Sequence, residues 1–432
     1  MSGQHTKSGE PIVTCDPHLM KLVTPKWHFT YLRWGTSKFL AGAAVPGMFI
    51  NSYARADIGA YGTTAMNADV SDIFVEQVKD GKYLFEGEWL ALEERTEIFQ
   101  VRGFGHKNHT YYYTKNGPLL EPFKGDGAKL VVWFDPRLTY PDPSSNKRYS
   151  VKWAYSSYDF NVNSATTYKK GMHAETGLEM IKYVGGTTVG PINIIFAHKT
   201  GDFGYAPGVL FPRRKYNVPQ GVFPKKGWLK ESQWLEVVAS EELPFVLNPA
   251  KGYVVSTNQR LTSKNVKNGI TFAQAMSYRA IRFEELLSGY ISAGKKIGFE
   301  EQRRMQLDTV DIQARHSVPT MLQILNKVKL ETFERYPDLS KHQAVGDQAK
   351  ILLEGFDFDM RADSASAAVF HEWEYQIQRH LHGYKVKDEQ MRLTLAAPFL
   401  FDDFIYGQID LWKDDIKAQH QMCIMFGEEK RD

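Results

Sequence analysis

The pattern of apolar and polar residues changes character part-way along the 432-residue chain. Up to about residue 258, short runs of β-branched and aromatic residues lie between Gly, Pro and Asn, which is typical of strands. Three such runs are residues 130–134, 192–197 and 252–256. From about residue 271, apolar residues recur at the spacing of an amphipathic helix. The helical runs are residues 273–287, 300–328 (interrupted at Pro319) and 364–381. The pattern predicts the α+β class, with a β-rich core followed by a helical region.

The first residues of the chain predict a small hairpin. Lys7-Ser8-Gly9 is a turn sequence between two short extended pieces, and the second piece ends at an Asp16-Pro17-His18 corner. The first ten residues are polar and carry no signal-peptide pattern, so the compartment stays open.

Composition and charge exclude several classes of protein. A net charge of +3 is too small to favour a nucleic acid or an anionic membrane surface as partner. The longest apolar runs have the length of strands, so we expect no transmembrane segment. Cys15 and Cys423 are the only cysteines of the sequence and cannot form a disulfide framework.

General catalytic motifs do not identify a function. The sequence has no Gly-x-Ser-x-Gly elbow, no phosphate-binding loop and no His-Glu-x-x-His motif. The His106/His109 and His371/His380/His382 groups lack Cys or carboxylate partners at zinc-ligand spacing, so solvated histidines are the favoured interpretation. Cys15 has no evident activating base nearby in the sequence, which argues against a nucleophilic role.

A series of short motifs carries more information because of its order. In chain order the motifs include Asp16-Pro17-His18-Leu19, Ala44-Val45-Pro46-Gly47-Met48, Gly62-Thr63-Thr64-Ala65, Asp69-Val70-Ser71-Asp72, Gly190-Pro191-Ile192-Asn193, Phe211-Pro212-Arg213-Arg214 and Tyr278-Arg279-Ala280. This order resembles the β subunit of the penicillin amidase family of N-terminal-nucleophile (Ntn) hydrolases. The resemblance implies part of a four-layer αββα core over residues 1–290, and a helical region of the same family domain over residues 291–432.

The resemblance also implies an activity and roles for individual residues. Members hydrolyse carbon–nitrogen bonds of small N-acylated substrates, using a serine whose own α-amino group is the base. By position, the Ala65 backbone N–H and the Asn258 side-chain amide match the oxyanion donors. His18 matches a residue that orients the reacting amine, and Arg279 matches a supporting arginine. Purely structural roles stay open: a turn residue for Asn258, a corner cap for His18 and a helix-face residue for Arg279.

Two further sets of residues match family positions. Pro46 and Met66 match substrate-binding residues. The carboxylates of Asp69 and Asp72, with the Ser71 carbonyl between them, match ligands of a structural Ca²⁺ ion, which prefers oxygen donors. A later family acid falls near Asn268-Gly269, which offers no carboxylate.

The chain also departs from the family pattern at both ends. The catalytic serine of the family begins a Ser-Asn-x-Trp segment just before the hairpin, and this sequence does not contain that segment. Ser2 lies several residues out of register with His18, so we do not expect it to replace the nucleophile. We also expect the C-terminal part of the family domain to be missing, and an α-subunit-like chain or flanking segments to complete the protein.

Two functions from different classes therefore stay open. The first is a penicillin-amidase-like hydrolase of linear, non-peptide amides whose nucleophile lies outside this chain. An N-acyl homoserine lactone or lipid-amide substrate would be a variant of it. The second is a catalytically inactive homologue that acts as a structural or binding subunit of a larger assembly.

Overall fold

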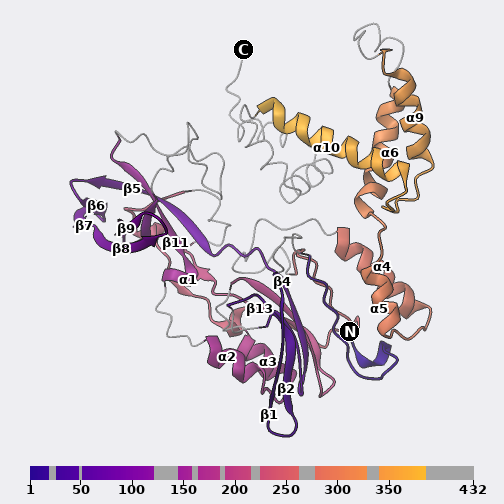
Figure 1. Cartoon of the computed structure of the whole chain (residues 1–432), viewed down its shortest axis with the longest axis horizontal. Helices are drawn as coiled ribbons and strands as arrows, with labels where there is room; N and C mark the ends of the chain where they lie inside the picture. The colour runs from indigo at the N-terminus through magenta and orange to yellow at the C-terminus, as the bar shows by residue number, and fades with distance from the viewer. Residues whose placement is uncertain are drawn as a thin grey trace. The chain divides into compact units, whose positions relative to one another are not determined.

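The computed structural model describes residues 1–18, 26–47, 51–120, 145–157, 164–184, 190–215, 224–261, 278–327 and 340–385 (Figure 1). The chain divides into two compact units, of which the first is Met1–Val254 with Leu261–Phe272 and the second is Val255–Arg260 with Ala273–Asp432. Strands dominate the first unit and helices the second, so the α+β class predicted from the sequence is confirmed. The domain boundary at residue 290 stays a prediction.

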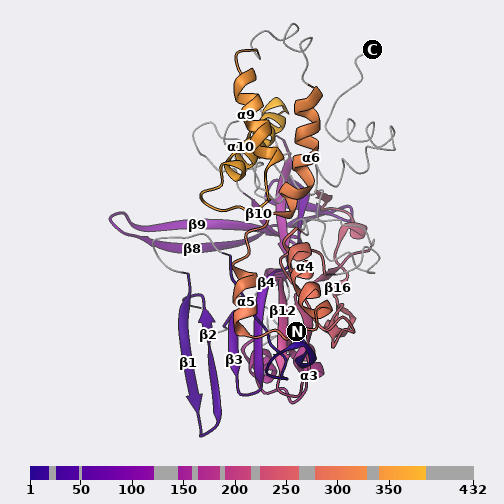
Figure 2. The ribbon, with the colours of Figure 1, turned by 90° about the vertical axis from the view of Figure 1, so that its right-hand side faces the viewer.

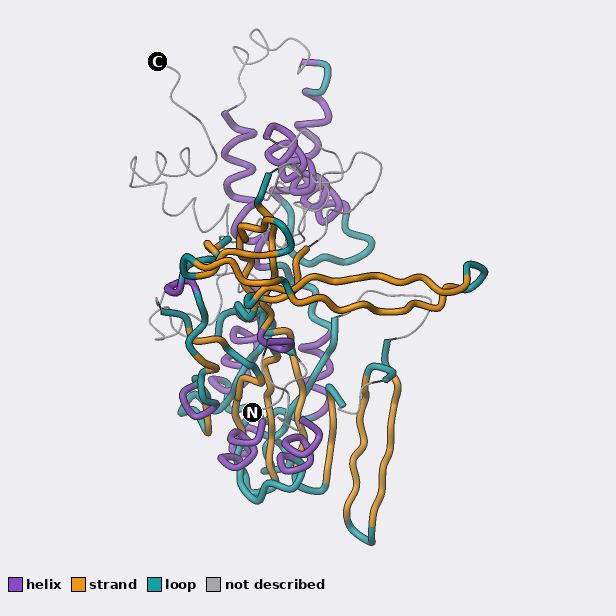
Figure 3. Tube along the Cα trace, turned by 90° about the vertical axis from the view of Figure 1, so that its left-hand side faces the viewer, coloured by secondary structure: helices purple, strands orange, loops and turns teal. Residues whose placement is uncertain are grey.

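A seven-stranded antiparallel sheet forms the base of the first unit. In spatial order its strands are β1 (His28–Trp34), β2 (Lys38–Ala44), β3 (Tyr53–Ala56), β4 (Gly59–Ala65), β12 (Ile192–His198), β13 (Phe203–Gly208) and β17 (Val246–Leu247). Figure 3 shows β1 and β2 as a long hairpin at one edge of this sheet. The strand predicted at 192–197 is confirmed as β12, whose two neighbours bury it inside the sheet.

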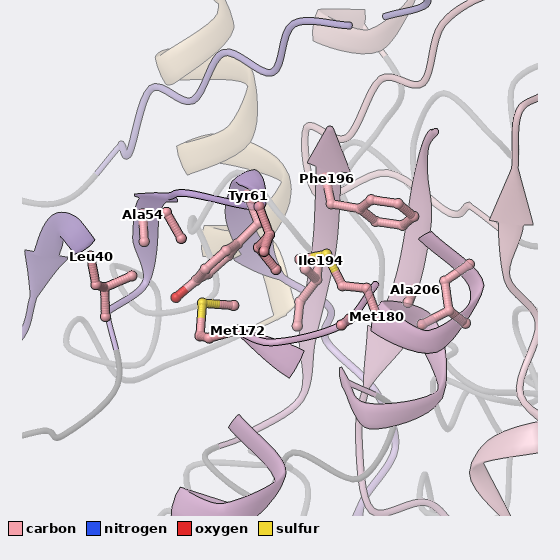
Figure 4. Close-up of a cluster of buried hydrophobic side chains, with 12 residues drawn as sticks. Leu40, Ala54, Tyr61, Met172, Met180, Ile194, Phe196 and Ala206 are labelled. Atoms are coloured by element: carbon pink, nitrogen blue, oxygen red, sulfur yellow. The ribbon is translucent and has the colours of Figure 1, made fainter. Parts of the chain in front are cut away.

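Two short helices cover one face of this sheet. They are α2 (Ser164–Gly171) and α3 (Gly177–Val184). Met180 and Ile181 of α3 share a buried cluster with Ile194, Phe196 and Ala206 of the sheet (Figure 4). Burying each large apolar side chain contributes about 1.5–3 kcal/mol, so this cluster holds helices and sheet together. The sequence pattern did not indicate α2 and α3, because eight residues are too few for a clear helical period.

The N-terminal segment lies on the opposite face of the same sheet. Tyr61 faces the helices, so Gly62, the next residue of β4, faces away from them. A Cβ atom at Gly62 would lie 1.5 Å from Cys15 Sγ, so the segment packs directly on the glycine. The predicted first extended piece is wrong: Gly3–His5 is a 3-10 helix that Ser2 caps through its side chain.

A second, eight-stranded sheet also belongs to the first unit. Its main path is β7 (Glu88–Ala91), β6 (Lys82–Phe85), β5 (Ser71–Lys79), β11 (Lys147–Trp153), β10 (Gly117–Leu120), β9 (Gly105–Thr114) and β8 (Glu93–Val101), while β15 (Lys225–Lys226) pairs in parallel with β5. Figure 2 shows β8 and β9 as a long two-stranded ribbon. On β5, Asp72, Phe74 and Glu76 alternate onto one face and are at most 1% exposed.

Shorter elements complete the first unit. They are α1 (Ala154–Ser157), the two-stranded pair β14 (Pro212–Arg213) and β16 (Glu236–Val237), and the 3-10 helices η3 (Lys230–Ser232) and η4 (Ser240–Glu242). The strand predicted at 252–256 is wrong. Gly252 has φ +81°, and its carbonyl accepts from the Ser2 N–H (2.8 Å) in place of a strand partner. The strand predicted at 130–134 lies outside the described residues.

The second unit is built from helices around its own core. Those that the structure describes are α4 (Tyr278–Ser292), α5 (Phe299–Gln306), α6 (Ile312–Lys327), α9 (Gln343–Glu354) and α10 (Ala365–Lys385). A buried cluster that includes Val318, Met321, Leu353 and Phe370 joins α6, α9 and α10. None of the helices that the structure describes is long and apolar enough to cross a bilayer.

The helical run predicted over 300–328 is interrupted before Ile312 and not at Pro319, where the interruption was expected. The break lies between α5 and α6, whereas Pro319 is inside α6. Asp311 starts α6, because its carboxylate accepts from the backbone N–H groups of Gln313 (2.7 Å) and Ala314 (3.2 Å). Burial of Val318 beside the proline stabilises the helix against the loss of one backbone hydrogen bond.

Candidate functional site

An open pocket of about 390 Å³ lies where β4 ends and β12 begins. Its wall is formed by Tyr53, Thr63, Thr64, Ala65, Asn67, Gly190, Pro191 and Ile192. Ala65 is the last residue of β4 and pairs with Ile192, the first residue of β12. The next residue, Met66, donates its backbone N–H to the Pro191 carbonyl (3.0 Å), which continues the pairing past the strand ends. The site therefore opens at the end of a fixed pair of central strands.

A buried asparagine fixes the backbone at Ala65. Asn193 is 3% exposed, and its Nδ2 donates to the Ala65 carbonyl (3.2 Å) and to Thr64 Oγ1 (3.1 Å). Its Oδ1 accepts from the Tyr205 hydroxyl (3.1 Å), so both ends of the amide are bonded. The contact holds the peptide plane that follows Ala65 and limits the rotation of the pocket wall. The sequence signal for this residue was a polar side chain inside the apolar run 192–197, which the site prediction did not use.

The other predicted residues of the first unit lie in different surroundings. His18 is exposed and contacts Asp16 Oδ2 through Nε2 (3.1 Å). Pro46 is exposed in the turn after β2. The Met66 side chain is 4% exposed and packs in a buried cluster with Val70 and Phe211. Among the described residues, the pocket wall includes Ala65 but none of these three side chains.

Asn258 and Arg279 lie together in the second unit. Arg279 Nη2 donates to the Thr257 carbonyl (2.7 Å) and to Asn258 Oδ1 (2.9 Å). Because Oδ1 faces the guanidinium, the Nδ2 end of the amide points away from Arg279. Asn258 has φ +71°, a conformation that asparagine tolerates better than most residues. Burial lowers the pKa of Arg279, which nevertheless keeps its charge at neutral pH.

The turn that carries Asn258 is held by a second side chain. Gln259 Oε1 accepts from the Thr257 N–H (2.6 Å), and Gln259 Nε2 donates to the Val255 carbonyl (2.8 Å). Arg279 and Gln259 therefore bind the backbone of the turn at Val255 and Thr257, just before Asn258. These contacts fix the backbone of the turn, and the Arg279 bond to Oδ1 fixes the direction of the Asn258 amide.

Asp69 and Asp72 lie beside two cationic side chains. Arg214 donates from Nε to Asp72 Oδ2 (2.9 Å) and from Nη2 to Asp69 Oδ1 (3.1 Å). Lys225 Nζ donates to the same Asp72 oxygen (2.7 Å), as does Trp234 Nε1. Ser71 begins β5, where it pairs with Trp153 of β11.

Comparison with known proteins gives the family. The penicillin amidase profile matches residues 1–425. The chain belongs to the penicillin amidase family. The resemblance that the ordered motifs indicated is thereby confirmed.

Curated relatives of this family member include acylases. An acyl-homoserine lactone acylase, QuiP of Pseudomonas fluorescens, is 24% identical over 376 residues, which cover 85% of this chain and 42% of that protein. The penicillin acylase 2 proenzyme of Pseudomonas sp. (strain SE83) is 24% identical over 290 residues, covering 65% of this chain and 34% of that protein. The chain thus spans less than half the length of these curated relatives.

A solved structure shares the fold. A thermostable penicillin G acylase from Alcaligenes faecalis aligns with a TM-score of 0.66 and 19% identity, covering 91% of this chain and 65% of that chain. At this identity the likeness shows the fold.

The Asp69 and Asp72 carboxylates do not fit the calcium ion that the family resemblance implies. Asp72 Oδ2 accepts three N–H donors, and two cations already balance the two carboxylates. A divalent ion would have to displace Arg214 and Lys225 to reach Asp72 Oδ2. Among the described residues, no three or more His, Cys, Asp or Glu side chains gather as a metal site.

Proposed function

We propose that this chain is part of a hydrolase that cleaves the amide bond of a small N-acylated compound. The observation that carries the proposal is the pocket whose wall includes Ala65, the position that the family resemblance assigns to an oxyanion donor. Asn193 holds the Ala65 carbonyl, so the peptide groups around Ala65 are fixed before a substrate arrives. Preorganised donors are the largest single contribution to many acyl-transfer reactions, because they need no reorganisation in the transition state.

The lining of the pocket supports an acyl group as the bound part of the substrate. Tyr53, Pro191 and Ile192 give it apolar surface, while the hydroxyls of Thr63 and Thr64 add a few polar contacts. Such a mixture is typical of small-molecule sites, in which a few polar groups orient an apolar ligand. The relatives named as acyl-homoserine lactone acylases and penicillin acylases make an N-acyl amide the first substrate class to test.

The remaining family features belong to this proposal as well. We infer that the nucleophile is a serine outside residues 1–432, whose hydroxyl attacks the acyl carbonyl while its α-amino group accepts the proton. The leaving amine then takes that proton, and water hydrolyses the acyl-enzyme. The seven-stranded sheet with α2 and α3 would supply one β layer and one α layer of the family's αββα core. His18 as an amine-orienting residue, and Pro46 and Met66 as substrate contacts, stay predictions.

Asn258 offers the sharpest test of the chemistry. In the complete protein, Asn258→Asp keeps the acceptor that faces Arg279 and a side chain that tolerates the positive φ, but it removes the N–H donor. We expect kcat for a chromogenic N-acyl anilide to fall roughly 10²–10³-fold, with a much smaller change in KM. Asn326→Asp, on an exposed position of α6, is the matched control and should leave both constants unchanged.

The outcomes separate the two functional classes. Loss of turnover in Asn258→Asp, with activity retained in the control, would support the hydrolase and its donor. Unchanged turnover in Asn258→Asp would overturn the role of Asn258. A folded, complete protein without turnover on a series of acyl chain lengths would refute the hydrolase and favour a structural or binding subunit.

A further inference from the structure

The ion cluster around Asp72 is buried. The side chains of Asp69 and Asp72 are 4% and 0% exposed, and those of Arg214 and Lys225 are 6% and 11% exposed. Charges so far from water are maintained only where opposite charges and hydrogen bonds offset the cost of desolvation. Two carboxylates face two cations here, and Trp234 adds a neutral donor to Asp72 Oδ2, which offsets much of this cost. Among the described residues, Asp72 Oδ1 has no hydrogen-bond partner.

The aromatic surroundings of the cluster favour a guanidinium in this place. The Arg214 guanidinium lies 5.8 Å from the ring centres of both Phe211 and Trp234. Arginine, which is planar and more weakly hydrated than an ammonium group, is the cation that such a site accommodates best.

Arg214 also holds the backbone that leads away from the pocket. Its Nη1 and Nη2 both donate to the Asp69 carbonyl (3.1 Å each), while Nε binds Asp72 on β5. Asp69 follows Ala65 by four residues. At the pocket end of this segment, Met66 donates to the Pro191 carbonyl (3.0 Å). The segment is therefore fixed at both of its ends.

We propose that Arg214 and Lys225 are internal counter-cations that replace a divalent metal ion at the Asp69/Asp72 site, and that Arg214 is a positioning residue for the Ala65 end of the pocket. The first part stands on the ion cluster alone. The second part rests on the proposed function, because it gives the Ala65 backbone a catalytic use.

Metal independence is tested on the unmodified, complete protein. We expect EDTA and millimolar calcium to leave the melting temperature unchanged, and calorimetric titration to detect no calcium binding. Hydrogen exchange in peptides covering residues 66–72 should also be the same with EDTA and with calcium. A calcium-dependent rise in melting temperature, together with slower exchange in residues 66–72, would overturn the first part.

Variants test the positioning role. We expect Arg214→Met to speed hydrogen exchange in residues 66–72, whereas Arg213→Met, which removes only ion pairs to Glu236 and Glu242 at the surface, should not. Arg214→Lys retains a charge but not the paired bonds to Asp69. We expect Arg214→Lys to be more stable than Arg214→Met but less stable than the parent protein. Its kcat should be on the order of 10²-fold below that of the parent, at nearly constant KM.

Each result has a separate meaning. Unchanged exchange in Arg214→Met, or full recovery of kcat in Arg214→Lys, would refute the positioning role. If Arg214→Met fails to fold, Arg214→Lys and the metal titration still decide both parts. A complete protein without turnover would sink the proposed function and the positioning role, but the titration would still test the counter-cations.

Discussion

Glu76 is a buried carboxylate whose three hydrogen-bond donors are neutral. It is 0% exposed on β5, and its Oε1 accepts from Thr114 Oγ1 (2.9 Å), Asn116 Nδ2 (2.9 Å) and Ser150 Oγ (2.6 Å). Among the described residues no cation pairs with it. We predict that Glu76→Ala destabilises the first unit by about 3–5 kcal/mol, because it leaves buried donors unsatisfied and opens a cavity.

The isosteric change should behave differently. Glu76→Gln keeps an acceptor at the Oε1 position and removes a charge that no described cation balances, so we expect a change within about 1 kcal/mol. Glu97→Ala, on the exposed strand β8, is the surface control and should stay within about 0.5 kcal/mol.

Local hydrogen exchange measures these differences without assuming that both units unfold together. Exchange of amides in peptides from β5 and β11 gives the opening free energy of the strands that carry Glu76 and Ser150. Urea unfolding provides a second measure of the free energy of unfolding, provided that the m-value is the same in the variants and the parent. A loss below about 1 kcal/mol in Glu76→Ala, or an equal loss in Glu76→Gln, would show that the three donors do not stabilise this face as argued.

Two further predictions follow from titratable groups. Burial, followed by the charge of Asp16, raises the pKa of Cys15 to about 12. We therefore expect iodoacetamide at pH 8 to alkylate Cys15 about three orders of magnitude more slowly than an ordinary thiol. An alkylation rate equal to that of an ordinary thiol, measured in a Cys423→Ser variant, would contradict this. Burial tends to raise the pKa of Glu285, but hydrogen bonds from Arg315 and Arg282 outweigh it and lower the pKa below 4.5. The ion pairs of Glu285 should therefore stabilise the second unit at pH values above the unfolded-state pKa of Glu285. This contribution should be lost as the pH falls through the lower pKa of Glu285 in the folded state. A Glu285→Gln variant whose acid unfolding curve matched that of the parent would contradict this.

Properties that depend on neighbouring residues in the sequence were predictable. The change from strands to helices, β12 and α10 follow from runs of β-branched and aromatic residues bounded by Gly, Pro and Asn, and from apolar residues spaced three to four apart. Ser364 accepts from the Ala367 N–H (3.2 Å), so a local N-cap signal also marks the start of α10 correctly.

Elements that tertiary contacts decide were not predictable in this way. Pro319 is a local signal for a helix break, yet α6 continues through it because Val318 and Met321 are buried against other helices. Residues 252–256 have the composition of a strand, but Gly252 adopts φ +81°. Its carbonyl accepts from the N–H of Ser2, which is distant from it in the sequence. In both cases distant contacts outweigh the local preference.

The acidic pair Asp69 and Asp72 shows why a site can be located from sequence while its partner stays undecided. Two carboxylates at this spacing can supply part of a calcium ligand set or accept hydrogen bonds from a guanidinium, and the residues next to them in the sequence do not distinguish the two. The partner that decides the matter, Arg214, lies 142 residues beyond Asp72. Lys225 comes from a strand of two residues that no periodicity could reveal. The residues that the fold brings next to an acidic motif therefore decide which ligand the motif binds. Here the fold brings two cations, Arg214 and Lys225, next to Asp72.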